Sequence, residues 1–94
     1  MARIPVTVIS EKDFLAIHQL CAGRIADAHG AWEWQRDLNN RDEVASGHEL
    51  VPIQITPVEL QNYCRRHDCQ PDETAIRLLT EEKFMEAERG ALAS

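Results

Sequence analysis

The stretch VPIQITPVE, Val51 to Glu59, decides the fold of this chain. β-branched residues occupy every second position of its first half, a period of two that is typical of a strand with one buried face. Thr56 and Glu59 then stand three residues apart, and Pro57 follows Thr56, which is the pattern of a capping box with proline in the first helical turn. The stretch predicts a strand over 50–55 that passes directly into a helix.

A similar pattern occurs about 46 residues earlier, in IPVTVIS at positions 4–10. A proline again precedes alternating β-branched residues, and Ser10 with Asp13 resembles a capping box in which aspartate replaces glutamate. Because Pro5 removes a backbone donor, this strand is expected to be an edge strand or to begin here. The chain therefore contains two strand–helix units, and the sequence leaves open whether they arose by duplication.

Apolar residues at helical spacing predict helices over about 11–38, 57–68 and 71–89. A break of the first helix near Gly30 is an alternative, because glycine destabilises a helix by roughly 1 kcal/mol relative to alanine. One apolar stripe runs along this helix and is formed by Phe14, Ile17, Cys21, Ile25, Ala28 and Trp32.

Turn-forming and charged residues fill positions 39–49, which we expect to form a loop with one helical turn at 41–45. The predicted fold class is α+β, predominantly helical, in the order β-α-β-α-α with a small two-stranded element. A chain of 94 residues is expected to form a single small domain, 1–94.

The composition is acidic, with 16 Asp and Glu against 10 Lys and Arg and a formal charge of −6. Such a surface repels phosphate backbones, so direct nucleic-acid binding is not expected, whereas a basic protein surface is a suitable partner. The chain has neither an apolar run of about 18 residues nor the pattern of a signal peptide. Its three cysteines are irregularly spaced and do not indicate a disulfide framework. These features predict a cytoplasmic protein.

The third predicted helix is apolar on two opposite sides. One side is formed by Ile76, Leu79, Phe84, Ala87 and Ala91. The other side is formed by Leu78, Met85 and Leu92. A helix that is apolar on two sides needs two surfaces to pack against, and charged residues flank the second side as they flank a coiled-coil seam. Either the helix is enclosed by its own chain, or the second side binds something else.

We expect a small non-catalytic protein-binding module, a regulator, adaptor or inhibitor, that docks through this C-terminal helix to another protein or to a second copy in a homodimer. Trp34 points away from the apolar stripe, and an exposed tryptophan is common at interfaces. The predicted interface residues are Trp34, Leu78, Glu81, Met85, Glu88 and Leu92. An alternative is an acidic inhibitor that occupies the nucleic-acid-binding groove of a target complex, as some mobile-element inhibitors do.

Histidine and cysteine side chains raise the alternative of a small zinc-binding protein, since zinc prefers thiolate and imidazole ligands. The candidate ligands are His18, Cys21, Cys64, His67 and Cys69. Neither His-Cys pair has the C-x2-4-C spacing of a structural zinc knuckle, so neither a metal nor another cofactor is expected. The sequence also lacks a glycine-rich phosphate loop, G-x-S-x-G and H-E-x-x-H, so no catalytic activity is expected.

Residues 51–79, VPIQITPVELQNYCRRHDCQPDETAIRLL, resemble a ribbon-helix-helix repressor over under a third of the chain. The resemblance implies a DNA-binding regulator whose strand pairs across a dimer and places Pro52, Gln54 and Thr56 in the major groove. The sequence departs from that family in its proline inside the strand, in its short first helix and in the absence of basic residues beside the strand.

Overall fold

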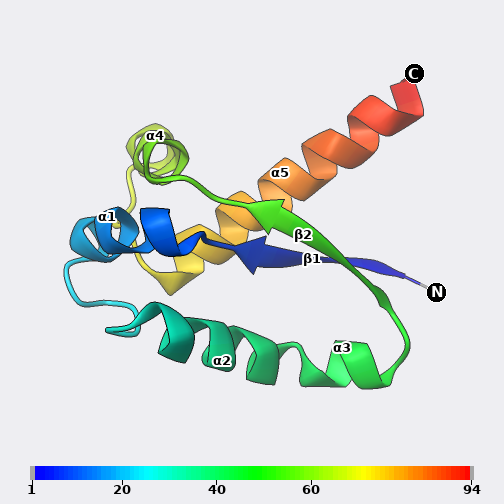
Figure 1. Cartoon of the computed structure of the whole chain (residues 1–94). Coiled ribbons are helices and arrows are strands. Elements are labelled where there is room, and N and C mark those ends of the chain that lie inside the picture. The colour runs from blue at the N-terminus through cyan, green and yellow to red at the C-terminus, as the bar shows by residue number, and fades with distance from the viewer. Residues whose placement is uncertain (1, 94) are drawn as a thin grey trace.

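Two short parallel strands lie between the helices (Figure 1). This computed structural model describes the main chain of residues 2–93 and the side chains of residues 2–90. In chain order its elements are β1 (Arg3–Val8), α1 (Glu11–Cys21), α2 (His29–Asn39), α3 (Arg41–Ala45), β2 (Glu49–Gln54), α4 (Pro57–His67) and α5 (Glu73–Ala93). The predicted class, α+β and predominantly helical with a two-stranded element, is confirmed.

Both strand-to-helix transitions form side-chain caps. Thr56 Oγ1 accepts the Glu59 N–H at 3.3 Å, and a Glu59 carboxylate oxygen accepts the Thr56 N–H at 3.0 Å, which completes the predicted capping box. Ser10 Oγ accepts the Asp13 N–H at 3.1 Å. Backbone donors in the first turn of a helix have no intrahelical partner, and these side chains satisfy one or two at each start.

The structure divides the helix predicted over 11–38 into α1 and α2. Ala22 adopts the left-handed conformation at φ 50°, and Gly23 follows at φ 82°. Two successive positive φ values end the helix, and glycine tolerates such a φ without the strain that a Cβ atom causes. The break therefore lies at Gly23 rather than at Gly30, which falls within the first turn of α2.

The remaining helix predictions agree with the structure to within a few residues. The helix expected over 57–68 is α4, and the helical turn expected at 41–45 is α3. The helix expected over 71–89 is α5, which begins two residues later because the Asp72 carboxylate accepts the Ala75 N–H at 2.8 Å and so caps its start.

The core lies at the carboxyl ends of the strands. Ile9 and Ile55 each follow a strand directly and are only 1% and 0% exposed. The other buried apolar residues are Phe14, Ile17, Cys21, Ile25, Trp32, Leu60, Tyr63, Cys64, Ala75, Ile76 and Leu79. The apolar stripe predicted for the first helix is therefore buried except for Ala28, because the turn after α1 brings α2 back onto the same core.

Prolines face outward from both strands of the sheet. The Ile55 N–H donates to the Val8 carbonyl at 2.9 Å. This bond shows which residues of each strand direct their backbone N–H and C=O groups towards the other strand. Because successive residues direct their backbone groups to opposite sides, Pro5 and Pro52 both occupy outward-facing positions. Neither proline removes a bond from the sheet, and neither offers a donor to an incoming strand.

Cations also occupy outward-facing carbonyl groups of this sheet. Arg36 of α2 donates to the Thr7 carbonyl at 3.0 Å, and Lys83 of α5 donates to the Gln54 carbonyl. Each outer edge thus has one carbonyl acceptor occupied by a cation and one backbone donor removed by a proline. β1 and β2 are edge strands that are protected from pairing with a further strand.

Helix α5 crosses the sheet and continues past it (Figure 1). The hydroxyl groups of Thr80 and Thr7 lie 2.7 Å apart and tie the helix to β1. Lys83 pairs with Glu59 of α4 at 2.6 Å. Among residues 2–93, no helix is long and apolar enough to cross a bilayer. The buried contacts of α5 lie in its first half, and its second half extends away from the core.

Candidate functional site

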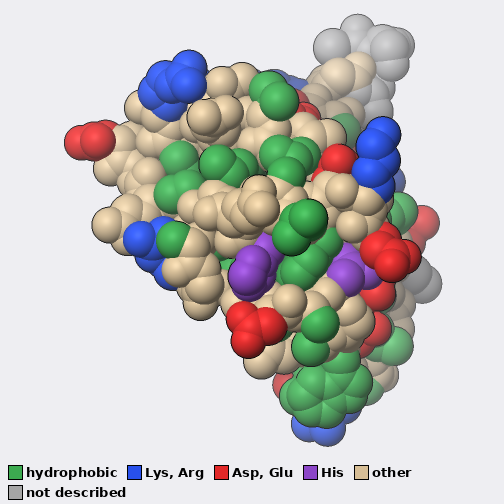
Figure 2. Space-filling view, turned by 60° about the vertical axis from the view of Figure 1, so that its left-hand side comes forward, with side chains coloured by type: hydrophobic (Ala, Val, Ile, Leu, Met, Phe, Trp, Pro, Cys, Tyr) green, Lys and Arg blue, Asp and Glu red, His purple; other side chains and the backbone are tan. Residues whose placement is uncertain are grey.

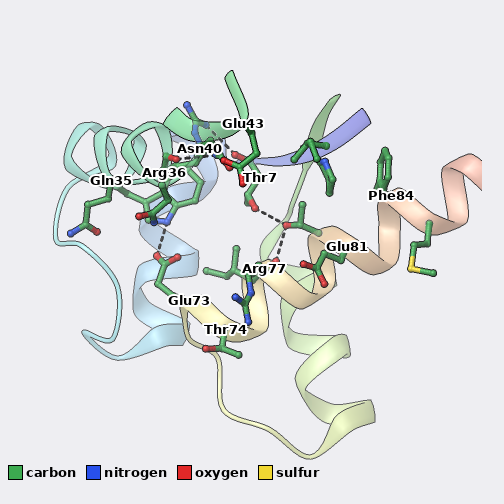
Figure 3. Close-up of a pocket in the computed structure, with 17 residues that line it drawn as sticks. Thr7, Gln35, Arg36, Asn40, Glu43, Glu73, Thr74, Arg77, Glu81 and Phe84 are labelled. Atoms are coloured by element: carbon green, nitrogen blue, oxygen red, sulfur yellow. Dashed lines mark hydrogen bonds between the residues drawn. The ribbon is translucent and has the colours of Figure 1, made fainter. Parts of the chain in front are cut away.

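A groove of about 790 Å³ lies between α2–α3 and α5, with β1 along its floor (Figure 3). Arg36, Asn40 and Glu43 form one wall, and Glu81 and Phe84 belong to the opposite wall. The two walls come from segments about 40 residues apart in the chain. Their approach depends on the parallel pairing of the strands, which places α2–α3 and α5 near the same strand.

One end of the groove is fixed by a partly buried hydrogen bond from a tryptophan side chain. The Trp32 indole N–H donates to the Glu73 carboxylate at 2.7 Å, which joins α2 to the start of α5. Burial raises the pKa of Glu73 above its usual value, and the nearby Asp72 adds to this, while the hydrogen bond from Trp32 opposes it. Trp32 is 3% exposed, so its ring is a fixed part of the wall rather than a mobile side chain.

The positive charge of Arg36 is already matched within the protein. Its guanidinium donates twice to the Asp37 carboxylate, at 3.0 and 3.1 Å, and lies 5.4 Å from the centre of the Trp32 ring. The same group donates to the Thr7 carbonyl. Arg36 therefore holds the wall together and is not free to receive an anion.

Glu43, on the wall formed by α2–α3, contributes an unsatisfied acceptor. Its Oε2 atom is buried and has no hydrogen-bond partner among the described residues. Figure 3 shows its side chain beside Thr7 and Asn40 and across the groove from Glu81. A buried carboxylate oxygen without a donor destabilises a protein, so Glu43 is stabilised if its carboxylate turns and meets a donor in the groove.

The two sides of α5 differ in the way that the sequence predicts over its first half. Ile76 and Leu79 are at most 3% exposed, whereas Leu78 is 40% and Met85 61% exposed. Phe84, which was expected in the core, is only partly buried and lines the groove, and Ala87 is exposed. The exposed apolar side chains and the groove therefore meet on one helix.

The predicted interface residues divide into three groups. Glu81 and Met85 line the groove, and Leu78 lies on the same exposed side of α5. Trp34 is 66% exposed on α2 but does not line the groove. Glu88 pairs with Arg3 of the same chain, and the side chain of Leu92 lies outside the described residues.

The structure brings Cys64 and Cys69 together but does not bring the five candidate zinc ligands to one point. Cys21 and Cys64 are buried, and burial raises the pKa of their thiols to about 11 and about 12, so both stay protonated at neutral pH. His18 lies 3.4 Å from Asp27, His67 stacks on Tyr63, and Cys69 is exposed. No group of three or more His, Cys, Asp or Glu side chains in the described part of the chain is placed to hold a metal ion.

A second apolar surface, over α1 and α4, was not predicted. Leu15 is 65% and Val58 64% exposed, and Figure 2 shows hydrophobic side chains gathered on this face. A shallow hollow of about 340 Å³ nearby is lined by Leu20, Pro57 and four other residues, none of them charged. Val58 stands in the first turn of α4.

The strand implied by the ribbon-helix-helix resemblance has its partner within the chain. β2 pairs in parallel with β1, and Pro52 closes its outer edge. Gln54 directs its carbonyl to Lys83 of α5. This arrangement argues against a ribbon shared between two copies.

Comparisons with known proteins add no further information about the site. No family model, no curated protein and no solved structure matches this chain.

Proposed function

We propose that this chain is a small protein-binding module without catalysis, which docks to a partner protein through α5 and the groove beside it. The observation that carries the proposal is the exposure of Leu78 and Met85 on a helix whose opposite side is already buried in the core. Exposed apolar side chains that line up on one element, next to a groove, are typical of interaction sites.

The charge of the chain supports a partner with a basic surface. The net charge is −6, and Glu81 and Glu86 are exposed on α5 close to Met85. Such a field attracts a basic partner and steers its approach. The three cysteines are free thiols, which suits a cytoplasmic protein.

The outer edges of the sheet are poor docking sites for a partner strand, which supports docking through a helix instead. A partner that adds a strand needs free donors and acceptors along an edge. Pro5 and Pro52 remove donors there, and Arg36 and Lys83 occupy acceptors. Strand addition is therefore disfavoured, which leaves docking through a helical surface such as that of α5.

The double variant Leu78→Glu with Met85→Glu tests the proposal. We expect it to lose the proteins that co-purify with the chain from its native cells, while circular dichroism shows unchanged helix content. The control is Leu15→Glu with Val58→Glu, which changes two exposed apolar residues on the face over α1 and α4. If the α5 variant keeps its partner, or the control variant loses it, α5 is not the docking surface.

A further inference from the structure

We infer that the groove between α2–α3 and α5 receives an arginine or lysine side chain of the partner protein, and that Glu43 is its main charged contact. This inference rests on the proposed function, because it names the chemistry of the partner at the same surface. It goes beyond that function because it assigns a binding subsite and a residue that the exposed side of α5 does not include.

The balance of charges in the groove favours a cationic occupant. Its walls carry the carboxylates of Glu43, Glu73 and Glu81 and the cations of Arg36 and Arg77. Arg36 is matched by Asp37, as its two hydrogen bonds to that carboxylate show.

Along α5, Arg77 has one acidic residue a turn before it and another a turn after it. Residues four apart on a helix are within reach of each other, and Glu73 and Glu81 stand four residues before and after Arg77. Glu43 lies on the opposite wall, and its buried Oε2 atom has no donor among the described residues. With Arg36 matched by Asp37, a single lining cation, Arg77, serves three lining carboxylates, and Glu43 is the one of the three that lies on the opposite wall from it.

The shape of the groove suits a long side chain with a cationic tip. Arginine and lysine place an apolar stem along hydrophobic surface and keep the charge at the end. Phe84 and Met85 of α5 offer apolar surface, and Figure 3 places Phe84 and Glu43 on opposite walls. Because the Oε2 atom is buried, the Glu43 carboxylate has to turn towards the groove, where a guanidinium or ammonium group supplies the missing donor in a charge-assisted hydrogen bond.

The hollow over α1 and α4 offers no comparable argument. Its lining residues include no charged side chain and no unsatisfied buried acceptor. Its apolar lining residues therefore do not indicate which occupant they bind, whereas the groove combines apolar walls with an excess of carboxylates.

The two tryptophans provide the reporter for a direct test. Trp32 lines the groove, and Trp34 does not. In a ¹⁵N-labelled sample of the full chain, their indole N–H groups give separate signals. We would titrate the sample with N-acetyl-arginine methylamide and with N-acetyl-lysine methylamide, and in parallel with N-acetyl-citrulline methylamide, which has the shape of arginine without its charge.

We expect the arginine or lysine probe to shift the Trp32 indole signal saturably, the citrulline probe to have little effect and the Trp34 signal to stay in place. Glu43→Gln keeps the size of the side chain and removes its charge, so it should weaken binding of the cationic probe by about tenfold or more. The control Glu11→Gln changes an exposed acid of α1 that does not line the groove and should bind as the parent chain does.

Three results would overturn the inference. The first is a Trp32 signal that does not move with either cation, or moves equally with citrulline. The second is unchanged affinity in Glu43→Gln, with its amide spectrum showing the same fold. The third is a dimer in analytical ultracentrifugation that Glu43→Gln dissociates, because a second copy then fills the groove.

The fate of the co-purified partner separates this inference from the proposed function. If Glu43→Gln retains the partner but the double variant at Leu78 and Met85 loses it, docking through α5 stands and the subsite is wrong. If both variants retain it, both proposals fail. If both variants lose the partner and the arginine or lysine probe behaves as expected, both are supported.

Discussion

The first half of the molecule, β1–α1–α2, and the second, β2–α4–α5, begin alike and end differently. α1 and α4 are both 11 residues long. Each ends at a residue in the left-handed conformation, Ala22 and Asp68, which stand 46 residues apart and both have φ 50°. The two halves then diverge, because α2 has 11 residues and α5 has 21.

The matched segments of the two halves contribute to the core, whereas the additional length of α5 contributes to the groove. The matched segments supply Ile9 and Ile55 at equivalent positions, both buried. The additional length of α5 carries Phe84 and Met85 beyond the core and builds one wall of the groove. The strand–cap–helix unit that occurs twice supplies much of the core, and the additional length of α5 carries exposed apolar side chains beyond it.

The largest expected effect tests whether the two halves contribute equally to the core. Ile9→Ala and Ile55→Ala each remove a fully buried side chain at matched positions, so each should lower the free energy of unfolding by about 2–5 kcal/mol. Urea unfolding followed by circular dichroism measures this. Val58→Ala, at an exposed position, should change the stability by less than about 0.5 kcal/mol. If one of the two substitutions lowers the free energy of unfolding much less than the other, the two halves are equivalent only in their backbone structure.

The next effect distinguishes the two helix caps. Thr56→Ala removes a cap that works in both directions with Glu59, whereas Ser10→Ala removes a single hydrogen bond to Asp13. Cap removal generally lowers stability by about 0.5–2 kcal/mol, so we expect Thr56→Ala near the upper end and Ser10→Ala near the lower. Thr56→Ser and Ser10→Thr keep an acceptor oxygen and should remain near the parent in the same urea experiment. An equal or reversed order would show that the reciprocal bond contributes little.

The local parts of this fold were predictable from the sequence because their causes lie within a few residues. The capping box at Thr56 and the helical turn at 41–45 need only neighbouring side chains. The break after α1 was misplaced to Gly30 because the apolar stripe continues through Ile25 as it would in one unbroken helix. Spacing alone does not show that a left-handed residue precedes Gly23.

The groove was beyond such reasoning, since its parts meet only through tertiary structure. Glu43 and Phe84 lie on different elements that the parallel strands bring together. The exposed side of α5 could be predicted because helical spacing places Leu78 and Met85 on the same side of it. The pairing of Glu88 with Arg3, 85 residues away, had no local signal.

A smaller effect compares the two outer edges of the sheet. Pro52 is exposed on β2, whereas Pro5 is partly covered and lies beside the groove next to α2–α3. Pro52→Val restores a donor on an accessible edge, so we expect concentration-dependent self-association in analytical ultracentrifugation. Pro5→Val should remain at the parent's association state, because α2–α3 lies along that edge. Each change should alter stability by less than about 1 kcal/mol.

The variant Pro52→Lys provides the control for this edge. It restores the same backbone donor but adds a charge of the kind that natural edge strands use against pairing. It should therefore associate less than Pro52→Val. Equal association of the valine variants at positions 5 and 52 would show that proline is not what protects β2.

The smallest effect compares two carboxylates whose pKa values move in opposite directions, Glu59 of α4 and Glu73 of α5. Burial works against ionisation of Glu59, but hydrogen bonds from Lys83 and Thr56 outweigh it and lower its pKa from the usual 4.5. Its stabilisation is present above pH 4.5 and is lost as the pH falls through the lower folded value. Burial raises the pKa of Glu73, so its contribution is present below pH 4.5 and is lost as the pH rises through the higher folded value.

Single variants separate these opposing contributions. Glu59→Gln should make the rise of unfolding free energy between about pH 3 and 6 shallower, because it removes the contribution that grows with pH. Glu73→Gln keeps an acceptor for the Trp32 indole and should make the same rise steeper, because it removes the contribution that falls with pH. Urea unfolding at constant ionic strength across this range measures both slopes. If both variants change the slope in the same direction, the ionised form of Glu73 is not disfavoured by its burial, and the end of the groove beside Trp32 is more open to water than its contacts indicate.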